Sequence, residues 1–350
     1  MSFKFNSICL KFTSVAAFLL ICLGLNAQYN FSEVDKYLAA NQKPLGNDLA
    51  MIVYKDGKVI YQKQMGEEFT VKTKAPIASC SKWLTAALVM TYVDEGKISL
   101  DERVSKYLPI FDTYGKGYIT IRQCLAQTTG ITDNSRTIMK IIERRKFETL
   151  EEEVNSFCKK EIAAKPGTQF FYGNMGLNIA GRIVEVISKK NFDALIRQRL
   201  FVPLEMKNSS FSPENGAVNP SGGAESTAAD YMNFLAMILD KGIYKGKRIL
   251  SEQSIAEMQT IQTANAEKKY VPKVAEGYDY GLGEWILEKD NVGNSTVVSS
   301  PGLFGTFPYV DKCRGYACIF FIKKLLNDER KDIYLEVKKK IDEQVKSSCN

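Results

Sequence analysis

The 350-residue chain contains no histidine. A Ser-His-Asp triad is therefore excluded, and so is a zinc or haem site with histidine ligands. Any acid–base catalysis has to use Lys, Tyr, Asp, Glu or Cys side chains. The cysteines form no C-x-x-C pair or other thiol cluster, so we expect no bound metal and no cofactor.

The chain also lacks long runs of one charge and long apolar segments. Its formal charge is +7, with basic and acidic residues intermixed, which gives no support for nucleic-acid binding. The apolar run Val15–Leu25 is too short to span a bilayer and follows Lys4 and Lys11. We therefore predict a signal peptide over residues 1–27 and a periplasmic or secreted protein. A retained membrane anchor is the alternative. The sequence leaves the oligomeric state open.

Six cysteines follow the predicted signal peptide, and none is paired by an obvious spacing. An oxidising compartment permits disulfides, but their connectivity cannot be read from the sequence. We expect most of the six to be buried free thiols.

Strand signals lie at both ends of the mature chain and helical signals lie between them. We expect a helix near 31–40, strands at 49–54 and 58–64 around Asp56-Gly57, helices at 81–95, 177–189 and 228–239, strands at 297–309 and 316–322, and a helix at 332–345. This order predicts an α+β fold with two lobes. One antiparallel sheet would use about 28–72 and 278–350, and a helical lobe would be inserted over about 73–277. The site would lie in the cleft between them.

The segment Ser79-Cys80-Ser81-Lys82 stands at the start of a predicted helix. Residues three apart share a helical face, so Lys82 lies near Ser79 and can act as its base if burial lowers the lysine pKa. The same spacing recurs at Ser156–Lys159, which we interpret as a solvated helix face. Cys80 is interpreted as core filler.

A second candidate motif is Tyr172-Gly173-Asn174. Tyr172 can act as base or acid beside a lysine, and Asn174 can hydrogen-bond a substrate amide. The similar Tyr231–Asn233 lies inside a predicted helix, where Tyr231 is expected to pack. We also expect Trp83 and Trp285 to have packing roles.

A third candidate motif is Ser300-Pro301-Gly302-Leu303, on the predicted late strand. Ser300 and Gly302 would face the substrate there. The helix start at Ser79 could offer one backbone N–H to an oxyanion. N–H groups alternate sides along a strand, so a strand beside Ser79 could present the Leu303 N–H as the second such donor.

These motifs resemble those of the serine β-lactamase and penicillin-binding protein superfamily. The similarity is greatest to class C β-lactamases and to related esterases and D-amino-acid peptidases, which carry S-x-x-K, Y-x-N and a K-T-G or H-x-G motif in this order. Further matches include Thr128-Thr129-Gly130, Pro166-Gly167-Thr168 and Tyr280-Gly281-Leu282-Gly283. The resemblance implies acylation of Ser79, with Lys82 and Tyr172 sharing proton transfer.

Two positions depart from this pattern. Ser300 stands where relatives have Lys or His, and Gln127 stands where many have His. The departures put substrate recognition in question more than catalysis. We therefore predict an exported serine hydrolase acting on small esters, D-amino-acid peptides or β-lactams. The alternative is a non-catalytic binding protein on a degenerate penicillin-binding scaffold.

Overall fold

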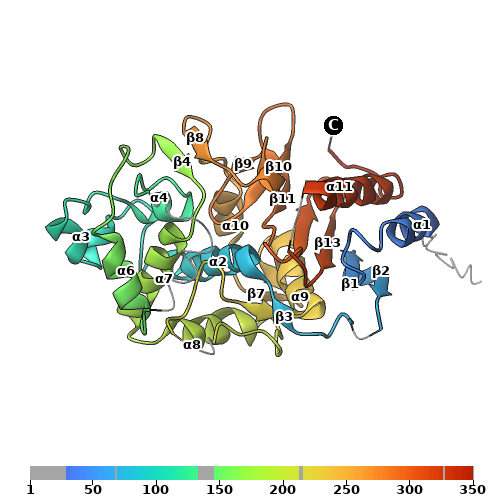
Figure 1. Cartoon of the computed structure of the whole chain (residues 1–350), viewed down its shortest axis with the longest axis horizontal. Helices are drawn as coiled ribbons and strands as arrows, with labels where there is room; N and C mark the ends of the chain where they lie inside the picture. Colours follow the sequence, from blue (N-terminus) through green and yellow to red (C-terminus); the bar gives the residue numbers. More distant parts are fainter. Residues whose placement is uncertain (1–28, 68, 133–145, 213–215, 326–327, 350) are drawn as a thin grey trace, which may run out of the picture.

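The computed structural model describes residues 29–67, 69–132, 146–212, 216–325 and 328–349. Figure 1 shows a sheet with α11 (Asp328–Asp342) and α1 (Ser32–Ala40) at one end of the molecule and a mainly helical region at the other. The predicted signal peptide lies outside the described residues. Within the described ranges, no helix is both long enough and apolar enough to cross a membrane.

The main sheet joins the two ends of the described chain. Its strands are β1 (Leu49–Lys55), β2 (Lys58–Met65), β9 (Asp279–Tyr280), β10 (Trp285–Lys289), β11 (Ser295–Ser299), β12 (Phe307–Asp311) and β13 (Tyr316–Phe321). They lie in the order β2-β1-β13-β12-β11-β10-β9, and all neighbours are antiparallel. Because β1 pairs with β13, the residues between the hairpin and β9 form an excursion from the sheet, as predicted.

The first hairpin forms where the sequence signal was strongest. Asp56 and Gly57 both adopt positive φ, 49° and 79°, as a two-residue hairpin turn requires. Alternation along β1 then divides its side chains between two cores. Ala50 and Ile52 pack with the helical region, whereas Met51 packs with residues of α1 and α11. The central strands β1, β13 and β12 are therefore largely buried on both faces, whereas most of the edge strand β2 is exposed or half-buried.

The helical region supplies one layer that packs on the sheet and a further group of helices. The remaining α-helices are α2 (Ser81–Asp94), α3 (Ile110–Thr113), α4 (Ile121–Leu125), α6 (Leu150–Phe157), α7 (Met175–Ser188), α8 (Phe192–Ile196), α9 (Ala228–Leu239) and α10 (Glu252–Met258). Short strands pair as β3 (Ala75–Pro76) with β5 (Glu225–Ser226), β4 (Gln169–Phe171) with β8 (Glu267–Tyr270), and β6 (Ile243–Tyr244) with β7 (Lys247–Arg248). The three long helices expected in this region are confirmed as α2, α7 and α9.

The prediction of one strand over 297–309 was wrong. The structure has β11 and β12 instead, with residues 300–306 outside both strands. Pro301 cannot donate a ladder hydrogen bond, and Gly305 has a φ of 91°. The chain turns between the two strands, because the Gly302 N–H donates to the Thr306 carbonyl at 2.8 Å.

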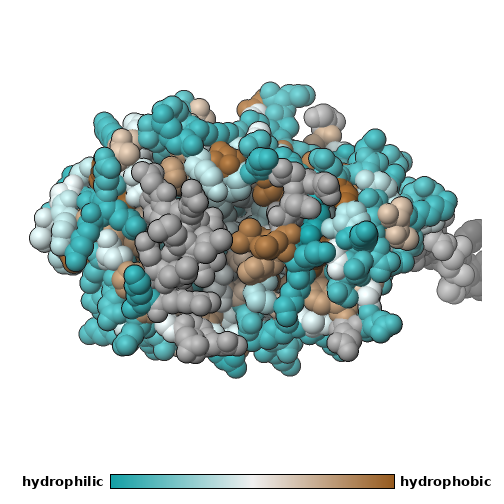
Figure 2. All heavy atoms as spheres, in the orientation of Figure 1, coloured by the Kyte–Doolittle hydropathy of each residue, from teal (hydrophilic) through white to brown (hydrophobic). Residues whose placement is uncertain are grey.

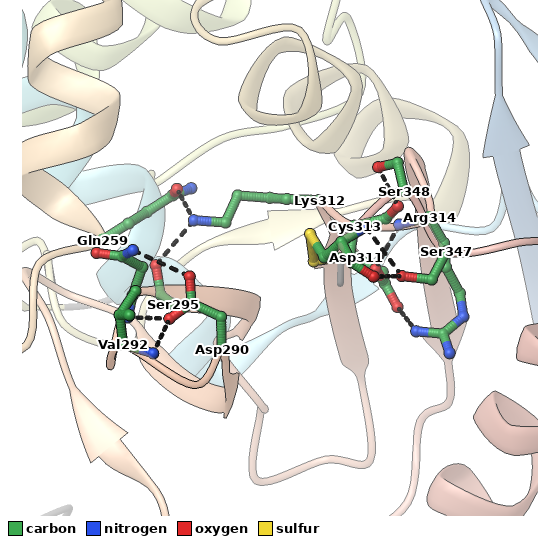
Figure 3. Close-up of a disulfide and its surroundings, with 12 residues drawn as sticks. Gln259, Asp290, Val292, Ser295, Asp311, Lys312, Cys313, Arg314, Ser347 and Ser348 are labelled. Atoms are coloured by element: carbon green, nitrogen blue, oxygen red, sulfur yellow. Dashed lines mark hydrogen bonds and ion pairs between the residues drawn. A yellow bond between two sulfur atoms is a disulfide. The ribbon is translucent and has the colours of Figure 1, made fainter.

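Most cysteines after residue 28 are buried free thiols, as expected: Cys80, Cys124, Cys158 and Cys318. The remaining two, Cys313 and Cys349, form a disulfide. It ties the turn between β12 and β13 to the segment after α11, where Ser348 also hydrogen-bonds the Cys313 carbonyl (Figure 3). The C-terminal segment is therefore fixed to the turn of the central β12–β13 hairpin.

Candidate active site

Ser79 lies in a single turn of 3-10 helix, η1 (Ala78–Cys80), directly before α2. The preceding residue, Ala78, has a φ of 45°. A non-glycine residue in this region costs roughly 1–3 kcal/mol and persists only where the surroundings enforce it. On the entering side, the Ile77 N–H donates to the Ala224 carbonyl at 3.0 Å. The half-buried Ser79 side chain is thereby held at the start of a buried helix.

Lys82 is 1% exposed and lies one helical turn after Ser79. Its Nζ is 3.2 Å from Ser79 Oγ, 3.1 Å from Asn174 Oδ1 and 2.9 Å from the Ser221 carbonyl oxygen. Burial lowers the pKa of Lys82 from 10.5 to about 7. A substantial fraction of the lysine is therefore neutral near pH 7.

The contacts of Lys82 also orient the neutral amine. A neutral amine has two hydrogens and one lone pair. The oxygens of Asn174 and Ser221 can only accept hydrogen bonds, so they take the two hydrogens. The lone pair then faces the Ser79 hydroxyl, which is the geometry that general-base removal of its proton requires.

Tyr172 follows β4 and lies over the same lysine. Lys82 Nζ is 5.0 Å from the centre of the Tyr172 ring. The ring packs against Trp285, with 5.0 Å between centroids, and against Tyr280. Burial raises the pKa of Tyr172, and hydrogen bonding to Ser79 partly offsets this effect. Tyr172 therefore keeps its proton at neutral pH, which suits a proton donor better than a base.

The third motif approaches the nucleophile from β11. The Ser300 hydroxyl is buried and donates to the Ser79 carbonyl at 3.1 Å, with the Gly283 carbonyl at 3.5 Å. A Cβ on Gly302 would lie only 2.3 Å from the Ile77 carbonyl oxygen. Only glycine allows this approach of the two backbones. Leu303 follows and is 42% exposed.

The structure thus brings Ser79, Lys82, Tyr172 and Asn174 together, and Ser300 and Gly302 lie against the nucleophile turn. Contact of Ser300, Gly302 and Leu303 with substrate stays a prediction. The Ser300 hydroxyl is engaged with main-chain carbonyls. The argument that Leu303 points its N–H into the site by strand alternation does not apply, because residues 300–306 are not a strand.

The two similar motifs lie elsewhere, as expected. The Ser156 hydroxyl donates to the Glu153 carbonyl at 2.6 Å within α6. Tyr231 is fully buried in α9. Its hydroxyl, however, donates to the Cys80 carbonyl at 2.9 Å. Tyr231 therefore supports Cys80, the residue after Ser79, a role that its sequence position did not indicate.

Ser221 was not identified from the sequence as part of the site, and Gln127 was noted only as a departure from the family pattern. Ser221 supplies its carbonyl to Lys82, and its own N–H is bound by Asn178 at 2.9 Å. The neighbouring Gly222-Gly223 was the available signal. The Gln127 side chain donates from Nε2 to the Gly173 carbonyl at 3.1 Å. The main-chain carbonyl of Gln127 accepts from the Phe171 N–H. It thus binds the main chain on both sides of Tyr172.

No group of three or more metal-ligating side chains gathers anywhere in the described ranges. A large cavity in the described part of the chain is lined by none of the site residues and is considered below. In the view of Figure 2 the molecular face is mostly hydrophilic, with a hydrophobic patch near its centre, where Figure 1 draws the right-hand end of α2.

A serine with a buried lysine one helical turn away, a tyrosine over that lysine and a strand end against the nucleophile define the serine β-lactamase and penicillin-binding superfamily. The family model described as Beta-lactamase matches residues 42–339. The chain therefore belongs to the beta-lactamase family.

Three relatives illustrate the range of this similarity. The crystal structure named "putative beta-lactamase from Bacteroides dorei DSM 17855" is 30% identical and has a TM-score of 0.80, with 90% of this chain and 98% of that one covered. "Protein flp" of Staphylococcus aureus (strain MW2) is 30% identical over 176 residues, which are 47% of this chain and 35% of that protein. The chain thus matches about a third of the length of this curated relative. The structure of "a family VIII carboxylesterase" has a TM-score of 0.71 at 18% identity, covering 88% and 96%, and shows the same fold.

Proposed function

We propose that this protein is an exported serine hydrolase that cleaves esters or amides through an acyl-enzyme at Ser79. The observation that carries the proposal is the geometry of Lys82, whose Nζ is 3.2 Å from Ser79 Oγ and whose pKa burial lowers to about 7. Export rests on the predicted signal peptide alone.

In the first half-reaction, neutral Lys82 accepts the Ser79 proton as Oγ attacks the substrate carbonyl carbon. Tyr172 donates its proton to the departing alcohol or amine, and the bond from the carbonyl carbon to the leaving group breaks. Proton transfer from Lys82 to Tyr172 then restores both groups. In the second half-reaction water attacks the acyl-enzyme by the same route, and Ser79 regains its proton.

Oxyanion stabilisation is assigned to main-chain N–H groups of Ser79 and Leu303. The Ser79 N–H lies at the start of a helix, where the partial positive charge favours a developing anion. Leu303 belongs to the turn that Gly302 brings within contact of Ile77. Such donors contribute roughly 3–4 kcal/mol each to the transition state in related chemistry.

Among substrates, uncharged short acyl esters fit this site better than carboxylate-bearing β-lactams. Ser300 offers a neutral hydroxyl where relatives have a cation, and that hydroxyl already donates to the Ser79 carbonyl. The exposed apolar side chain of Leu303 also favours an apolar acyl group. A charge-assisted hydrogen bond contributes about 1.5–3 kcal/mol, so its loss would lower the rate roughly ten- to a hundredfold.

Covalent labelling tests the proposal. A fluorophosphonate and a fluorescent penicillin should be offered to the wild type, to Ser79→Ala and to Ser156→Ala, and intact mass should be measured. We expect one fluorophosphonate adduct in the wild type and in Ser156→Ala, and none in Ser79→Ala. An adduct that survives in Ser79→Ala would place the nucleophile elsewhere. No adduct with either probe would instead favour the non-catalytic binding protein.

A substrate comparison then tests specificity. The kcat/KM for a nitrophenyl butyrate should exceed that for a chromogenic cephalosporin, and a D-alanyl peptide completes the panel. Cephalosporin turnover that matched or exceeded ester turnover would contradict the interpretation of Ser300.

A further inference from the structure

A large cavity that is lined by none of the residues around Ser79 lies on the face of the sheet that packs with α9 and α10. Its volume is about 1160 Å³, slightly above the usual range of roughly 300–1,000 Å³ for small-molecule sites. Ser295, at the first residue of β11, lines the cavity, whereas Ser300 follows the last residue of this strand. Ser295 and Ser300 are therefore roughly 16 Å apart along the chain.

One end of the cavity, lined by Gln259, Ser295 and Lys312, carries two hydrogen-bond donors. Lys312 Nζ donates to Gln259 Oε1 at 2.9 Å and to Ser295 Oγ at 2.8 Å (Figure 3). An ammonium has three hydrogens, so these bonds use two of them. Gln259 is 5% exposed, and in the part of the chain that the structure describes its Nε2 has no hydrogen-bond partner. Because Nε2 belongs to the same side-chain amide that accepts a hydrogen bond from Lys312, this N–H group and the third hydrogen of Lys312 Nζ lie close together.

The charge at this end favours an anion. In the described ranges no carboxylate lies within ion-pair distance of Lys312 Nζ. Burial lowers the pKa of Lys312, and the charges of Glu284 and Asp290 raise it by a smaller amount. Burial also raises the pKa of Glu284 to about 8, which leaves this carboxyl largely neutral at pH 7.

Other charged groups line the cavity nearer its mouth, and most are paired. Lys241 binds Glu252 at 2.8 Å, and Lys245 binds Glu205. Asp56 lies 3.4 Å from the Lys55 ammonium. Asp240 also lines the cavity. These pairs compensate one another, so the ammonium of Lys312 is the charge that lines the end of the cavity beside Gln259 and Ser295. Lys312 as a whole is exposed, whereas its two hydrogen bonds are partly buried.

Much of the remaining wall of the cavity is apolar. They include Ile52 of β1, Met232 and Ala236 of α9, and Ile255 of α10. We infer that this cavity is a second ligand site, which binds an amphipathic carboxylate with its carboxylate on Lys312 and Gln259 and its alkyl chain along α9 and α10. The inference does not depend on catalysis at Ser79.

Titration calorimetry with decanoate tests this inference, with decanol as the uncharged comparison. Lys312→Met keeps most of the side-chain volume and removes the charge, and we expect it to weaken decanoate binding about tenfold or more. Lys247→Met removes the same charge from an exposed residue of β7 outside the cavity and should bind as the wild type does. Decanol should bind wild type and Lys312→Met equally.

A second variant protects the test from a folding defect in the first. Ala256 is exposed on α10 and lines the cavity mouth, so Ala256→Trp should block entry without disturbing the core. Hydrogen exchange should show decanoate protecting α10 and the second half of α9. The inference is overturned if wild type fails to bind decanoate at about 1 mM, if Ala256→Trp binds as tightly as wild type, or if protection appears around Ser79 and Tyr172 instead.

Discussion

Lys82 is expected to set the pH dependence of hydrolysis. Burial lowers its pKa from 10.5 to about 7, which corresponds to about 5 kcal/mol in favour of the neutral amine. Near pH 7 about half of the molecules then carry a neutral Lys82, whereas a solvated lysine would be neutral in fewer than about 0.1%. Because the neutral form is the base, activity should fall as the pH drops through 7 and level off above it.

The measurement is kcat/KM for nitrophenyl butyrate from about pH 5 to about pH 9, which reports groups of the free enzyme. Absorbance should be read where nitrophenol and nitrophenolate absorb equally, and the rate of Ser79→Ala should be subtracted. We expect kcat/KM at pH 5 to be about a hundredfold below the plateau, since the neutral amine falls about tenfold per pH unit below its pKa. The absence of histidine removes the usual competing assignment for a transition near pH 7.

Two variants identify the group. Lys82→Arg should lose activity at every pH, because a guanidinium keeps its proton. Glu284→Gln should retain the transition, which matters because burial raises the pKa of Glu284 into the same region, to about 8. A transition near pH 10, a flat profile, or a transition that disappears in Glu284→Gln would refute the assignment of Lys82 as the base.

Three further predictions concern stability and the nucleophile turn. Burial raises the pKa of Glu284 from 4.5 to about 8, so its contribution to stability is complete below pH 4.5 and is lost as the pH rises through about 8. Between pH 4.5 and about 8, the free energy of unfolding in urea should rise for Glu284→Gln relative to the wild type, by up to about 5 kcal/mol. Gly302→Ala would place a Cβ 2.3 Å from the Ile77 carbonyl, and the forced shift should lower ester kcat/KM about a hundredfold while a circular dichroism spectrum stays native. Reduction of the Cys313–Cys349 disulfide, 36 residues apart, should cost up to about 4 kcal/mol. Dithiothreitol should lower the Tm of the wild type but not that of Cys349→Ser.

Local signals predicted the elements well. Asp56-Gly57 adopts the two positive φ angles of a tight hairpin turn, and the apolar spacing that predicted a helix over 228–239 gave α9 with the same bounds. These features depend on residues close in sequence. The single strand predicted over 297–309 was wrong, because the β-forming residues on both sides outweighed Pro301 and Gly305 in that interpretation.

Tertiary contacts account for what the sequence did not predict. The Ser221 carbonyl on Lys82 and the Tyr231 hydroxyl on the Cys80 carbonyl each join segments more than a hundred residues apart, with separations of 139 and 151. A main-chain carbonyl that accepts a hydrogen bond cannot be predicted from the residue type, since every residue has one. Tyr231 looked like packing, and it is fully buried, but its hydroxyl also needs a partner once it leaves water. The fold determines which acceptor the Tyr231 hydroxyl finds.

Position 300 is one of the two positions at which this chain departs from the family motif, and the departure changes the chemistry beside Ser79. A lysine there would bring a cation to the substrate, whereas Ser300 donates to the Ser79 carbonyl and lies beneath the Gly283 carbonyl. The hydroxyl thus stabilises the turn that carries the nucleophile. Gln127 does the same for the main chain beside Tyr172, through its bond to the Gly173 carbonyl. Both departures from the family pattern replace an ionisable group by a neutral one that binds main chain. Such replacements leave Ser79 and Tyr172 in place and remove charge from the proposed recognition site, which is why we propose an uncharged substrate rather than a loss of catalysis.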